Sequence, residues 1–292
     1  CAPIFAYELF DRYKFLFASF IILFFVGIMD DIMVLRAYKK LLAQALVSIL
    51  MVVGSDVRIR SIFGLFGVYE INYYISIAFS ILTFIILINA FNLIDGIDGL
   101  AGSYTIATSI LFGISFFRLG PANDPLVILC AIIIAALFAF LFYNLSNKRN
   151  AKIFMGDTGS MILGFLLAFT GISFIEIFIQ KRDEVFYHLQ SAPVIAVAIL
   201  ILPIIDTLMV IITRIYHGKS ILSPDKNHIH HKLLNLGLTH RRSTAYIIGY
   251  YLIIIAVAYS LRHLNVNYLL IIILFIGFLG AYLPIFLLRF KN

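Results

Sequence analysis

The sequence predicts an all-α, polytopic membrane protein with about nine transmembrane helices, organised as a single membrane-embedded domain over residues 1–292. Hydrophobic residues make up 62% of the chain and charged residues only 13%, whereas soluble domains carry about a quarter charged residues. The mean hydropathy is +1.03. This composition excludes a soluble enzyme, a disordered chain and a disulfide scaffold. The net charge of +7 fits basic membrane loops better than binding to nucleic acid, because the apolar runs are so dense.

The second observation is a series of nine apolar runs that contain no Asp, Glu, Lys or Arg. They cover residues 15–29, 41–55, 72–94, 99–117, 125–147, 158–175, 185–205, 243–261 and 263–288. A helix that crosses the membrane needs roughly 20 apolar residues, so the first two runs should recruit flanking residues or tilt. Strands of a membrane barrel are excluded because these runs are long and do not alternate.

The third observation is the uneven distribution of basic residues between the two sets of loops. If nine spans alternate in direction, one side holds 14 Lys and Arg residues and the other holds 8. The positive-inside rule makes the richer side cytoplasmic, with the C-terminus on that side. The longest polar segment, residues 214–243, also lies there. It is too short for a domain, so we expect a functional cytoplasmic loop that contains histidines.

Four clusters of polar residues lie at the predicted cytoplasmic ends of the spans. One ends the first span, one ends the third, one opens the sixth and one follows the seventh. Their members are Asp30 and Asp31; Asn89, Asn92, Asp95 and Asp98; Asp157 within GDTGS; and His228, His230 and His231. Their agreement in side indicates a single site.

The cluster that ends the third span has the strongest functional pattern. Residues three apart on a helix are rotated by about 60°, so Asn89, Asn92 and Asp95 occupy adjoining strips. Amides and carboxylates in an apolar helix are costly unless they face a polar cavity or a cation. The alternative is a capped turn with solvated aspartates.

The segment Gly156–Ser160 opens a predicted helix, and its Asp, Thr and Ser residues are common N-cap residues, so a plain cap is one interpretation. The functional interpretation is that free N–H groups at this helix N-terminus bind a phosphate. Asp157 would then supply an oxygen ligand to Mg²⁺.

Asp30 and Asp31 also allow two interpretations. They are either solvated carboxylates at a helix end or part of a mixed-charge rim that suits a metal or a phosphate. The basic residues of this rim are Arg36, Lys39 and Lys40.

The three histidines indicate anion binding, because basic residues surround them. These are Lys226, Lys232, Arg241 and Arg242. Zinc is an alternative, but no Cys accompanies the histidines and the His-x-His-His spacing fits no common structural zinc site. Asp206 lies inside the seventh span, and an ionisable residue within a membrane span is a candidate functional residue. Its expected partner is Arg214 or a loop histidine.

Five stretches carry a resemblance to a known family. They are GIMDD ending at Asp31, NAFNLIDGIDGLAGS at 89–103, FMGDTGS at 154–160, PIIDTLMV at 203–210 and SPDKNHIHHKLLNLGLTHRR at 223–242. With these stretches, in this order, the chain resembles the polyprenyl-phosphate N-acetylhexosamine-1-phosphate transferases of glycosyltransferase family 4 over essentially its whole length. The HIHH pattern is similar to the branch that transfers N-acetylglucosamine-1-phosphate.

The resemblance implies a reaction between a lipid and a nucleotide sugar. Polyprenyl (undecaprenyl) phosphate attacks the sugar-linked phosphorus of a UDP-N-acetylhexosamine, which releases UMP and starts a lipid-linked cell-envelope glycan. It further implies Mg²⁺, with Mn²⁺ as an alternative ion, and a bacterial cytoplasmic membrane with the site facing the cytoplasm. It implies no nucleic acid partner and allows a homodimer.

The resemblance also assigns roles to single residues: two metal ligands, three catalytic residues, three nucleotide contacts and five phosphate or substrate contacts. In that order they are Asp157 and Asn92; Asp30, Asp31 and Asp95; Asp98, Phe154 and Asn89; and His228, His230, His231, Lys39 and Arg241. The role of Asp206 stays unassigned. Two roles remain open for the Asp30–Asp31 pair, namely activation of the lipid phosphate and nucleophilic attack through a phospho-enzyme.

Two departures and two rival classes accompany the resemblance. Relatives usually begin with one or two further spans, which we expect before Cys1, and residues 32–34 are apolar where relatives often have another charge.

An intramembrane aspartyl protease is one rival, since Gly156-Asp157 is similar to a GxGD-type site, but it predicts aspartates at membrane depth. A transporter is the other, and it favours broken helices and charges near the midplane.

Overall fold

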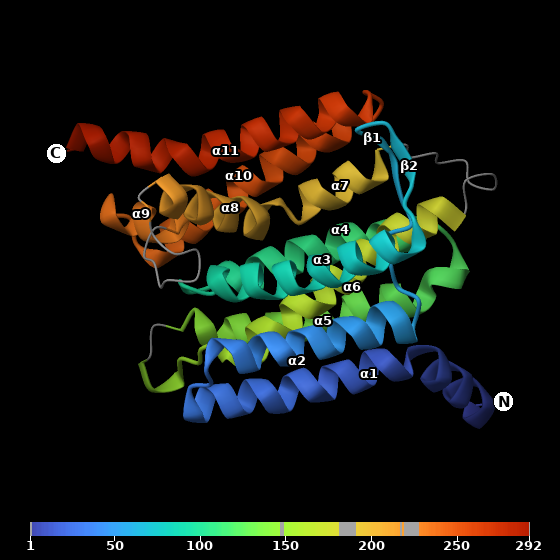
Figure 1. Cartoon of the computed structure of the whole chain (residues 1–292). Helices are drawn as coiled ribbons and strands as arrows, with labels where there is room; N and C mark the ends of the chain where they lie inside the picture. Colours follow the sequence, from blue (N-terminus) through green and yellow to red (C-terminus); the bar gives the residue numbers. More distant parts are fainter. Residues whose placement is uncertain (1, 147–148, 181–190, 217, 219–227, 292) are drawn as a thin grey trace.

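The computed structural model describes residues 2–146, 149–180, 191–216, 218 and 228–291 as a bundle of helices (Figure 1). The helices are α1 Ala2–Met33, α2 Ala37–Ile49, α3 Tyr73–Ile94, α4 Leu100–Arg118, α5 Asp124–Asn144, α6 Gly156–Gln180, α7 Ala192–Ile199, α8 Ile201–Tyr216, α9 Ile229–Asn235, α10 His240–Ser260 and α11 Val266–Lys291. A π-helical turn, Leu50–Gly54, extends α2, and two short strands, β1 Ser61–Leu65 and β2 Val68–Glu70, precede α3.

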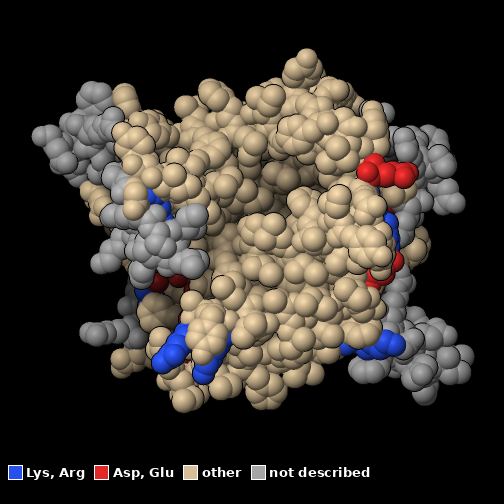
Figure 2. Space-filling model, viewed as in Figure 1, with Lys and Arg blue, Asp and Glu red and all other residues tan. Residues whose placement is uncertain are grey.

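Eight of the described helices are long and apolar enough to cross a membrane, and α7 with α8 makes a ninth span if this bent pair is counted as one. The protein is therefore an all-α, multi-pass membrane protein, which confirms the predicted fold class. Figure 2 shows the corresponding surface: charged side chains lie at the two ends of the bundle, and an uncharged belt separates them.

The seventh span differs from the single helix predicted over residues 185–205, whose first residues lie outside the described part. The helix breaks after Ile199, and α8 turns away from α7 by 74°. Pro203 accounts for the break, because proline has no N–H to donate to the carbonyl of Ile199, four residues earlier. The hydroxyls of Tyr104 and Tyr251 each donate to that carbonyl instead, at 3.0 Å.

Helix α6 is the central helix, and 94% of its membrane window is buried. It packs against α1, α3, α4 and α7. Two glycines allow a close approach: a Cβ at Gly27 of α1 would overlap the Cα of Thr158, and a Cβ at Gly164 would lie 2.9 Å from the Cα of Ile88 on α3. This packing fixes the first turn of α6 against the ends of α1 and α3.

The hairpin of β1 and β2 was not predicted from the sequence. It lies at the end of the bundle opposite α9 and reaches α11, where the Phe66 N–H donates to Oδ1 of Asn267 at 2.7 Å (Figure 1). Just before β1, the Arg60 N–H donates to Oε1 of Glu176 on α6 at 3.0 Å, and the Arg60 guanidinium forms an ion pair with the same carboxylate. The hairpin therefore ties α6 and α11 together at this end.

Candidate active site

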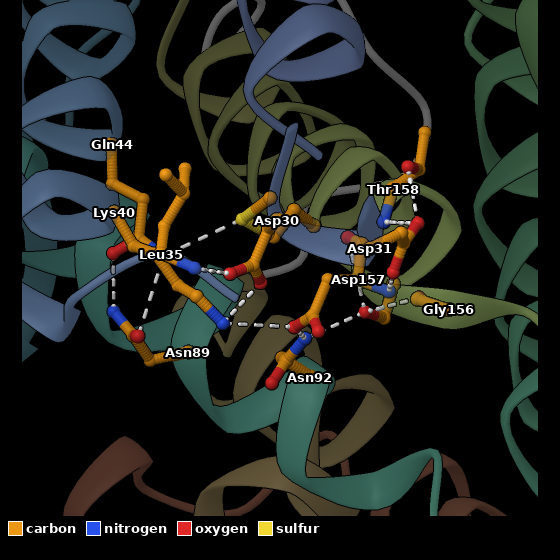
Figure 3. Close-up of polar contacts among 12 residues, drawn as sticks. Asp30, Asp31, Leu35, Lys40, Gln44, Asn89, Asn92, Gly156, Asp157 and Thr158 are labelled. Carbon is orange, nitrogen blue, oxygen red and sulfur yellow. Dashed lines mark hydrogen bonds and ion pairs between the residues drawn. The ribbon is translucent and has the colours of Figure 1, made fainter. Parts of the chain in front are cut away.

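Asp31, at the end of α1, lies against the first turn of α6 (Figure 3). Its Oδ1 accepts the N–H of Asp157 at 2.7 Å, and its Oδ2 accepts the N–H and the hydroxyl of Thr158 at 3.2 and 2.6 Å. A carboxylate is stabilised there because a helix N-terminus has unpaired N–H groups and a partial positive charge. Gly156 has a φ of +67°, and a Cβ there would lie 2.9 Å from the Asp31 oxygens. These N–H groups therefore bind the carboxylate of Asp31, whereas the sequence predicted that they would bind a phosphate.

Asp30 is buried and holds the turn between α1 and α2. Its Oδ1 accepts the N–H of Leu35 at 2.7 Å, and its Oδ2 forms an ion pair with Lys40 of α2. The same Lys40 Nζ lies 3.3 Å from Oδ1 of Asp157 (Figure 3). Lys40 therefore bridges two carboxylates and neutralises part of their charge.

Asn92 brings α3 into this network. Its Nδ2 donates to Oδ1 of Asp157 at 2.6 Å and to Oγ of Ser160 at 2.7 Å. Asn89, about one turn earlier, exchanges two hydrogen bonds with Gln44 of α2, at 2.6 and 3.3 Å. The two amides that the sequence placed on adjoining strips thus contact different helices.

The turn after α3 carries Asp95. Burial raises the pKa of Asp95 to about 6, and the negative charges of Asp157 and Asp98 add to this shift. Carboxylates that raise one another's pKa favour a bound cation, because a cation stabilises their ionised forms. This turn is therefore an electrostatically suitable neighbour for a metal on Asp157.

Asp98 is held by two side chains from other segments. Its Oδ2 accepts from Nζ of Lys152 at 2.5 Å and lies 3.1 Å from Nδ1 of His240. The same Lys152 Nζ lies 5.6 Å from the centre of the Phe154 ring, which is 76% exposed. An exposed ring beside a fixed carboxylate is an arrangement on which a base could stack.

Asp206 holds the start of α9. Its Oδ2 lies 2.7 Å from Nδ1 of His228, and its Oδ1 accepts the N–H of Ile229 at 2.8 Å. A loop histidine is thus a partner of Asp206, which is one of the two partners that the sequence left open.

His230 lies against the turn that carries Asp95, because a Cβ at Gly96 would overlap its Nε2. Its ring centre is 4.3 Å from that of His231 and 5.6 Å from that of His228. Burial lowers the pKa of His230 to about 4, so its imidazole is neutral at pH 7. Within the described part of the chain, the buried Nε2 has no hydrogen-bond partner, and a substrate atom could supply one.

The structure therefore brings most of the predicted residues to one end of the bundle, in three connected groups. These are Asp30, Asp31, Asn92 and Asp157; Asp95, Asp98 and Phe154; and Asp206, His228, His230 and His231. Three predicted residues lie outside these groups: Asn89 pairs with Gln44, Lys39 is exposed on α2, and Arg241 donates to the carbonyl of Leu145 at 2.6 Å.

The sequence named Lys40 only as one of three basic residues near Asp30 and Asp31, and the phosphate contact was assigned to its neighbour Lys39, whereas the structure gives the central position to Lys40. Other contributors were missed altogether. Gln44, Lys152 and His240 had no role in the prediction, although each bonds to a predicted residue. The basic character of residues 148–152 is the one signal that could have drawn attention to Lys152.

The fit of a divalent metal depends on oxygen donors. Among the described residues, no group of three His, Cys, Asp or Glu side chains converges on one point. Asp157 and Asn92 each use one side-chain atom in the network, which leaves Oδ2 of Asp157 and Oδ1 of Asn92 outside the hydrogen bonds found in the described part. Mg²⁺ keeps several waters and often binds one or two carboxylates plus substrate phosphates, so this donor set fits a hydrated ion.

The fold and the site define a multi-pass helical membrane protein with a polar, carboxylate-rich site where its helices end. Within that class, the chain belongs to glycosyl transferase family 4, whose family model matches residues 13–175.

Three similar proteins support membership of this family. The chain is 34% identical over 258 residues to the "Probable undecaprenyl-phosphate N-acetylglucosaminyl 1-phosphate transferase" of Bacillus subtilis (strain 168), a match that covers 87% of this chain and 68% of that protein. It is 33% identical to the "Decaprenyl-phosphate N-acetylglucosaminephosphotransferase" of Mycolicibacterium smegmatis, over 75% of this chain and 55% of the relative. It is 31% identical to the "Undecaprenyl-phosphate alpha-N-acetylglucosaminyl 1-phosphate transferase" of Escherichia coli (strain K12), over 76% and 58%. The chain thus spans little more than half the length of the last two.

Proposed function

We propose that the protein transfers N-acetylglucosamine-1-phosphate from UDP-N-acetylglucosamine to a polyprenyl phosphate and releases UMP. Family membership and the names of three relatives support the reaction type and the lipid acceptor. The observation that carries the proposal is the network of Asp30, Asp31, Lys40, Asn92 and Asp157, in which four helices contribute to one charged site (Figure 3).

The reaction joins two phosphates, so its main need is to position and neutralise negative groups. Lys40 offers a cation between Asp30 and Asp157, where an incoming phosphate would replace one carboxylate as its partner. Asp31 is engaged by the first turn of α6, which suits a residue that orients Asp157 more than a nucleophile. Asp30, released from Lys40 by the phosphate, is the better candidate to accept a proton from the acceptor.

The proposed metal site consists of Asp157 and Asn92, with Mg²⁺ as the ion and Mn²⁺ as a substitute. A bound Mg²⁺ would polarise the diphosphate of the sugar donor and neutralise its charge. Asp157 would supply a carboxylate oxygen and Asn92 its amide oxygen, while Asp95 would stay ionised beside the ion. This donor set distinguishes the proposal from an aspartyl protease, which needs two free carboxyl groups.

The nucleotide end of the site is proposed around Phe154. The uracil would stack on its exposed ring beside Asp98, which Lys152 and His240 hold in place. His230 would donate to or accept from the diphosphate through its unpartnered Nε2. The stack of histidines would thus meet the donor from the side of α9.

The orientation in the membrane is also a proposal. The basic-residue count supports a site on the cytoplasmic face, where a nucleotide sugar is available, and the bacterial relatives support an inner membrane as its location. A single-cysteine variant, Arg241→Cys in a Cys130→Ala background with Cys1 also replaced, should react with impermeant reagents from the cytoplasmic side alone. Reaction from the outer side would overturn this orientation.

The homodimer stays a prediction, which the mass of the protein in nanodiscs would test.

The decisive experiment measures UMP release in nanodiscs that contain undecaprenyl phosphate, across a panel of UDP-sugars and with Mg²⁺ added or removed by EDTA. We expect turnover with UDP-N-acetylglucosamine, dependent on Mg²⁺. Asp157→Asn should abolish it, and Mn²⁺ bound in the presence of UDP-sugar, measured by electron paramagnetic resonance, should be lost as well. Asp124→Asn, at the start of α5, is the matched control and should behave as wild type. Full turnover of Asp157→Asn would contradict the metal assignment.

A further inference from the structure

Asp206 is a buried carboxylate in the bent seventh span, and both of its oxygens are engaged at the start of α9. Its Oδ2 lies 2.7 Å from Nδ1 of His228, which is also buried, and its Oδ1 accepts the N–H of Ile229 at 2.8 Å. A carboxylate at such a position is costly unless it is paired and hydrogen-bonded. The cost is met here by residues that belong to the histidine cluster of the candidate site.

The bend of the seventh span gives Asp206 this place. The bend lies between α7 and α8, and Asp206 follows Pro203 by three residues on α8. Because α8 turns away by 74°, Asp206 no longer continues along the axis of α7 and instead meets the start of α9, which lies beside α8 at this end of the bundle (Figure 1). The break in the span therefore brings a carboxylate to the histidines.

The start of α9 depends on Asp206, because the residues of α9 do not cap it themselves. Its N-cap residue is His228, whose side chain makes no capping hydrogen bond in the described part of the chain. Helix α9 packs against α10 and α11. Between these helices and α8 lies an apolar cavity of about 30 Å³, lined by residues that include Ile205, Ile229 and Ile247. Since a void makes no van der Waals contacts, the hydrogen bonds of Asp206 decide where α9 sits relative to α8.

The position of α9 in turn sets the position of His230. The rings of His228 and His230 are parallel to within 6°, with their centres 5.6 Å apart. His230 lies in the first turn of α9 and faces Gly96, and among the described residues its buried Nε2 has no hydrogen-bond partner. Asp206 is thus connected to this nitrogen through His228 and through the first N–H of α9.

The contact with Asp206 also fixes which nitrogen of His228 carries a proton. An ionised carboxylate can only accept hydrogen bonds, so Nδ1 of His228 is the donor. Such a bond determines both the orientation and the tautomer of an imidazole. Asparagine at position 206 would reverse the bond: its Oδ1 can still accept the N–H of Ile229, while its Nδ2 donates to Nδ1 of His228 and leaves the ring proton on Nε2.

We infer that Asp206 is a positioning residue of the transfer reaction, which acts through His228 and the start of α9 to hold His230 at the Gly96 turn, where the donor diphosphate meets it. The inference rests on the proposed function, because it takes the diphosphate as the partner of His230. Asp206 itself contacts no substrate. The opposing explanation is that Asp206 only stabilises the packing of α8 and α9.

A double-mutant cycle separates the two explanations. It measures kcat/KM and, by calorimetry without turnover, Kd for UDP-N-acetylglucosamine in nanodiscs. Asp206→Leu removes both acceptors at similar volume and should lower kcat/KM and weaken binding about 10–100-fold, the usual cost of losing a residue that orients a ligand. In a His230→Ala background the same change should cost less than about twofold. An equal loss in both backgrounds would overturn the inference. KM for undecaprenyl phosphate should not change in any variant.

Asp206→Asn keeps the test decisive if Asp206→Leu does not fold. Nitrogen-15 NMR of labelled histidines should show a protonated Nδ1 on His228 in the wild type and a protonated Nε2 in the variant, with kcat/KM lowered about tenfold. An unchanged tautomer or an unchanged kcat/KM would contradict the positioning role.

Two substitutions of His228 test the route to His230. His228→Asn identifies the NMR signal of His228 and offers Asp206 a donor in place of Nδ1, so it should retain more donor affinity than His228→Leu. Equal losses in these two variants would overturn the route through His228.

Ile247→Val is the matched control for packing. It borders the same cavity without touching the Asp206–His228 pair, so it should lower the melting temperature and leave KM for the UDP-sugar unchanged. A raised KM in this control would attribute the effect of Asp206 to packing and overturn the inference.

The outcomes also separate the inference from the proposed function. Turnover by the wild type, with equal losses from Asp206→Leu in both backgrounds, would refute the positioning role and leave the function standing. Binding of UDP-N-acetylglucosamine that shows the coupling to His230, without turnover, would refute the function and leave the positioning role standing. A wild type that neither binds nor turns over any UDP-sugar would refute both.

Discussion

Asp31 and Asp157 are 126 residues apart in the sequence, and the carboxylate of the first accepts the backbone N–H of the second at 2.7 Å. This bond fixes the first turn of α6, where Asp157 also meets Lys40 and Asn92. Asp31 therefore acts on the site through Asp157, as an outer partner that orients a ligand.

Asp31→Asn tests this positioning role. Loss of the charge at the α6 N-terminus should lower the free energy of unfolding by about 0.5–1 kcal/mol. It should lower kcat for UMP release about 10–100-fold, as expected when a ligand loses its orienting partner. Asp124→Asn removes a carboxylate from the first turn of α5 at the other end, so it should cost similar stability and leave kcat unchanged. Equal activity of the two variants would contradict the role.

Asp95 should make stability depend on pH. Its pKa in the folded state is about 6, above the ordinary value of 3.8, so folding favours its protonated form. The stability that this protonation contributes is fully present below pH 3.8 and is lost as pH rises through about 6. Asp95→Asn keeps the neutral form at every pH, so at pH 8 it should be more stable than wild type by about 1–3 kcal/mol.

The measurement is the melting temperature of both proteins from pH 4 to pH 8. The difference should shrink as the pH falls, and Mg²⁺ should also reduce it at pH 8, because a cation beside Asp157 stabilises ionised Asp95. A constant difference across this range would show that Asp95 is not the group responsible.

Gly96→Ala should displace His230. The added Cβ would overlap Nε2 of His230, so α9 must shift away from the turn. We expect a higher KM for the UDP-sugar, and a loss of the contact between the histidines and the donor. Gly249→Ala is the matched control, since nothing lies within 4 Å of its Cβ, and it should keep wild-type KM. Enzyme kinetics on the two variants, with melting temperatures, would separate displacement from unfolding.

Tyr104 and Tyr251 should behave as a coupled pair. Each donates to the Ile199 carbonyl that Pro203 leaves without a helical partner. Tyr104→Phe or Tyr251→Phe alone should cost about 0.5–1 kcal/mol, because the other hydroxyl still satisfies the carbonyl. The double variant should cost about 2–3 kcal/mol, more than the sum, since it leaves a buried carbonyl unpaired. Reversible unfolding in mixed micelles would measure this cycle, and strict additivity would argue against shared satisfaction.

The membrane spans were predictable because a bilayer allows only helices or closed barrels to cross it. A run such as residues 125–147 has to be helical in lipid, and α5 covers it almost completely. The break after Ile199 was not predictable from apolarity, since both α7 and α8 are apolar and the bend depends on Pro203 together with tyrosines from two other helices. The hairpin was missed because its strands are short and anchored by distant residues such as Asn267.

The site was predictable as a set of residues but not as a set of contacts. Asn92 and Asp157 share a bond that their motifs anticipate. The choice of Lys40 over its neighbour depends on the rotation of α2 about its axis, which the sequence around it does not fix. Gln44 meets Asn89 through packing of α2 on α3, a relationship that no local pattern reveals.

Both ends of α6 are hydrogen-bonded to other segments. At its start the Asp157 N–H donates to Asp31, and near its end Glu176 accepts the Arg60 N–H. The helix also has almost no contact with lipid, since 94% of its membrane window is buried. Helices that do face lipid respond to a change in bilayer thickness by tilting. The position of Asp157 along the membrane normal is therefore set by the protein. Thinner or thicker bilayers should tilt the outer helices, while the depth of Asp157 in the membrane stays constant.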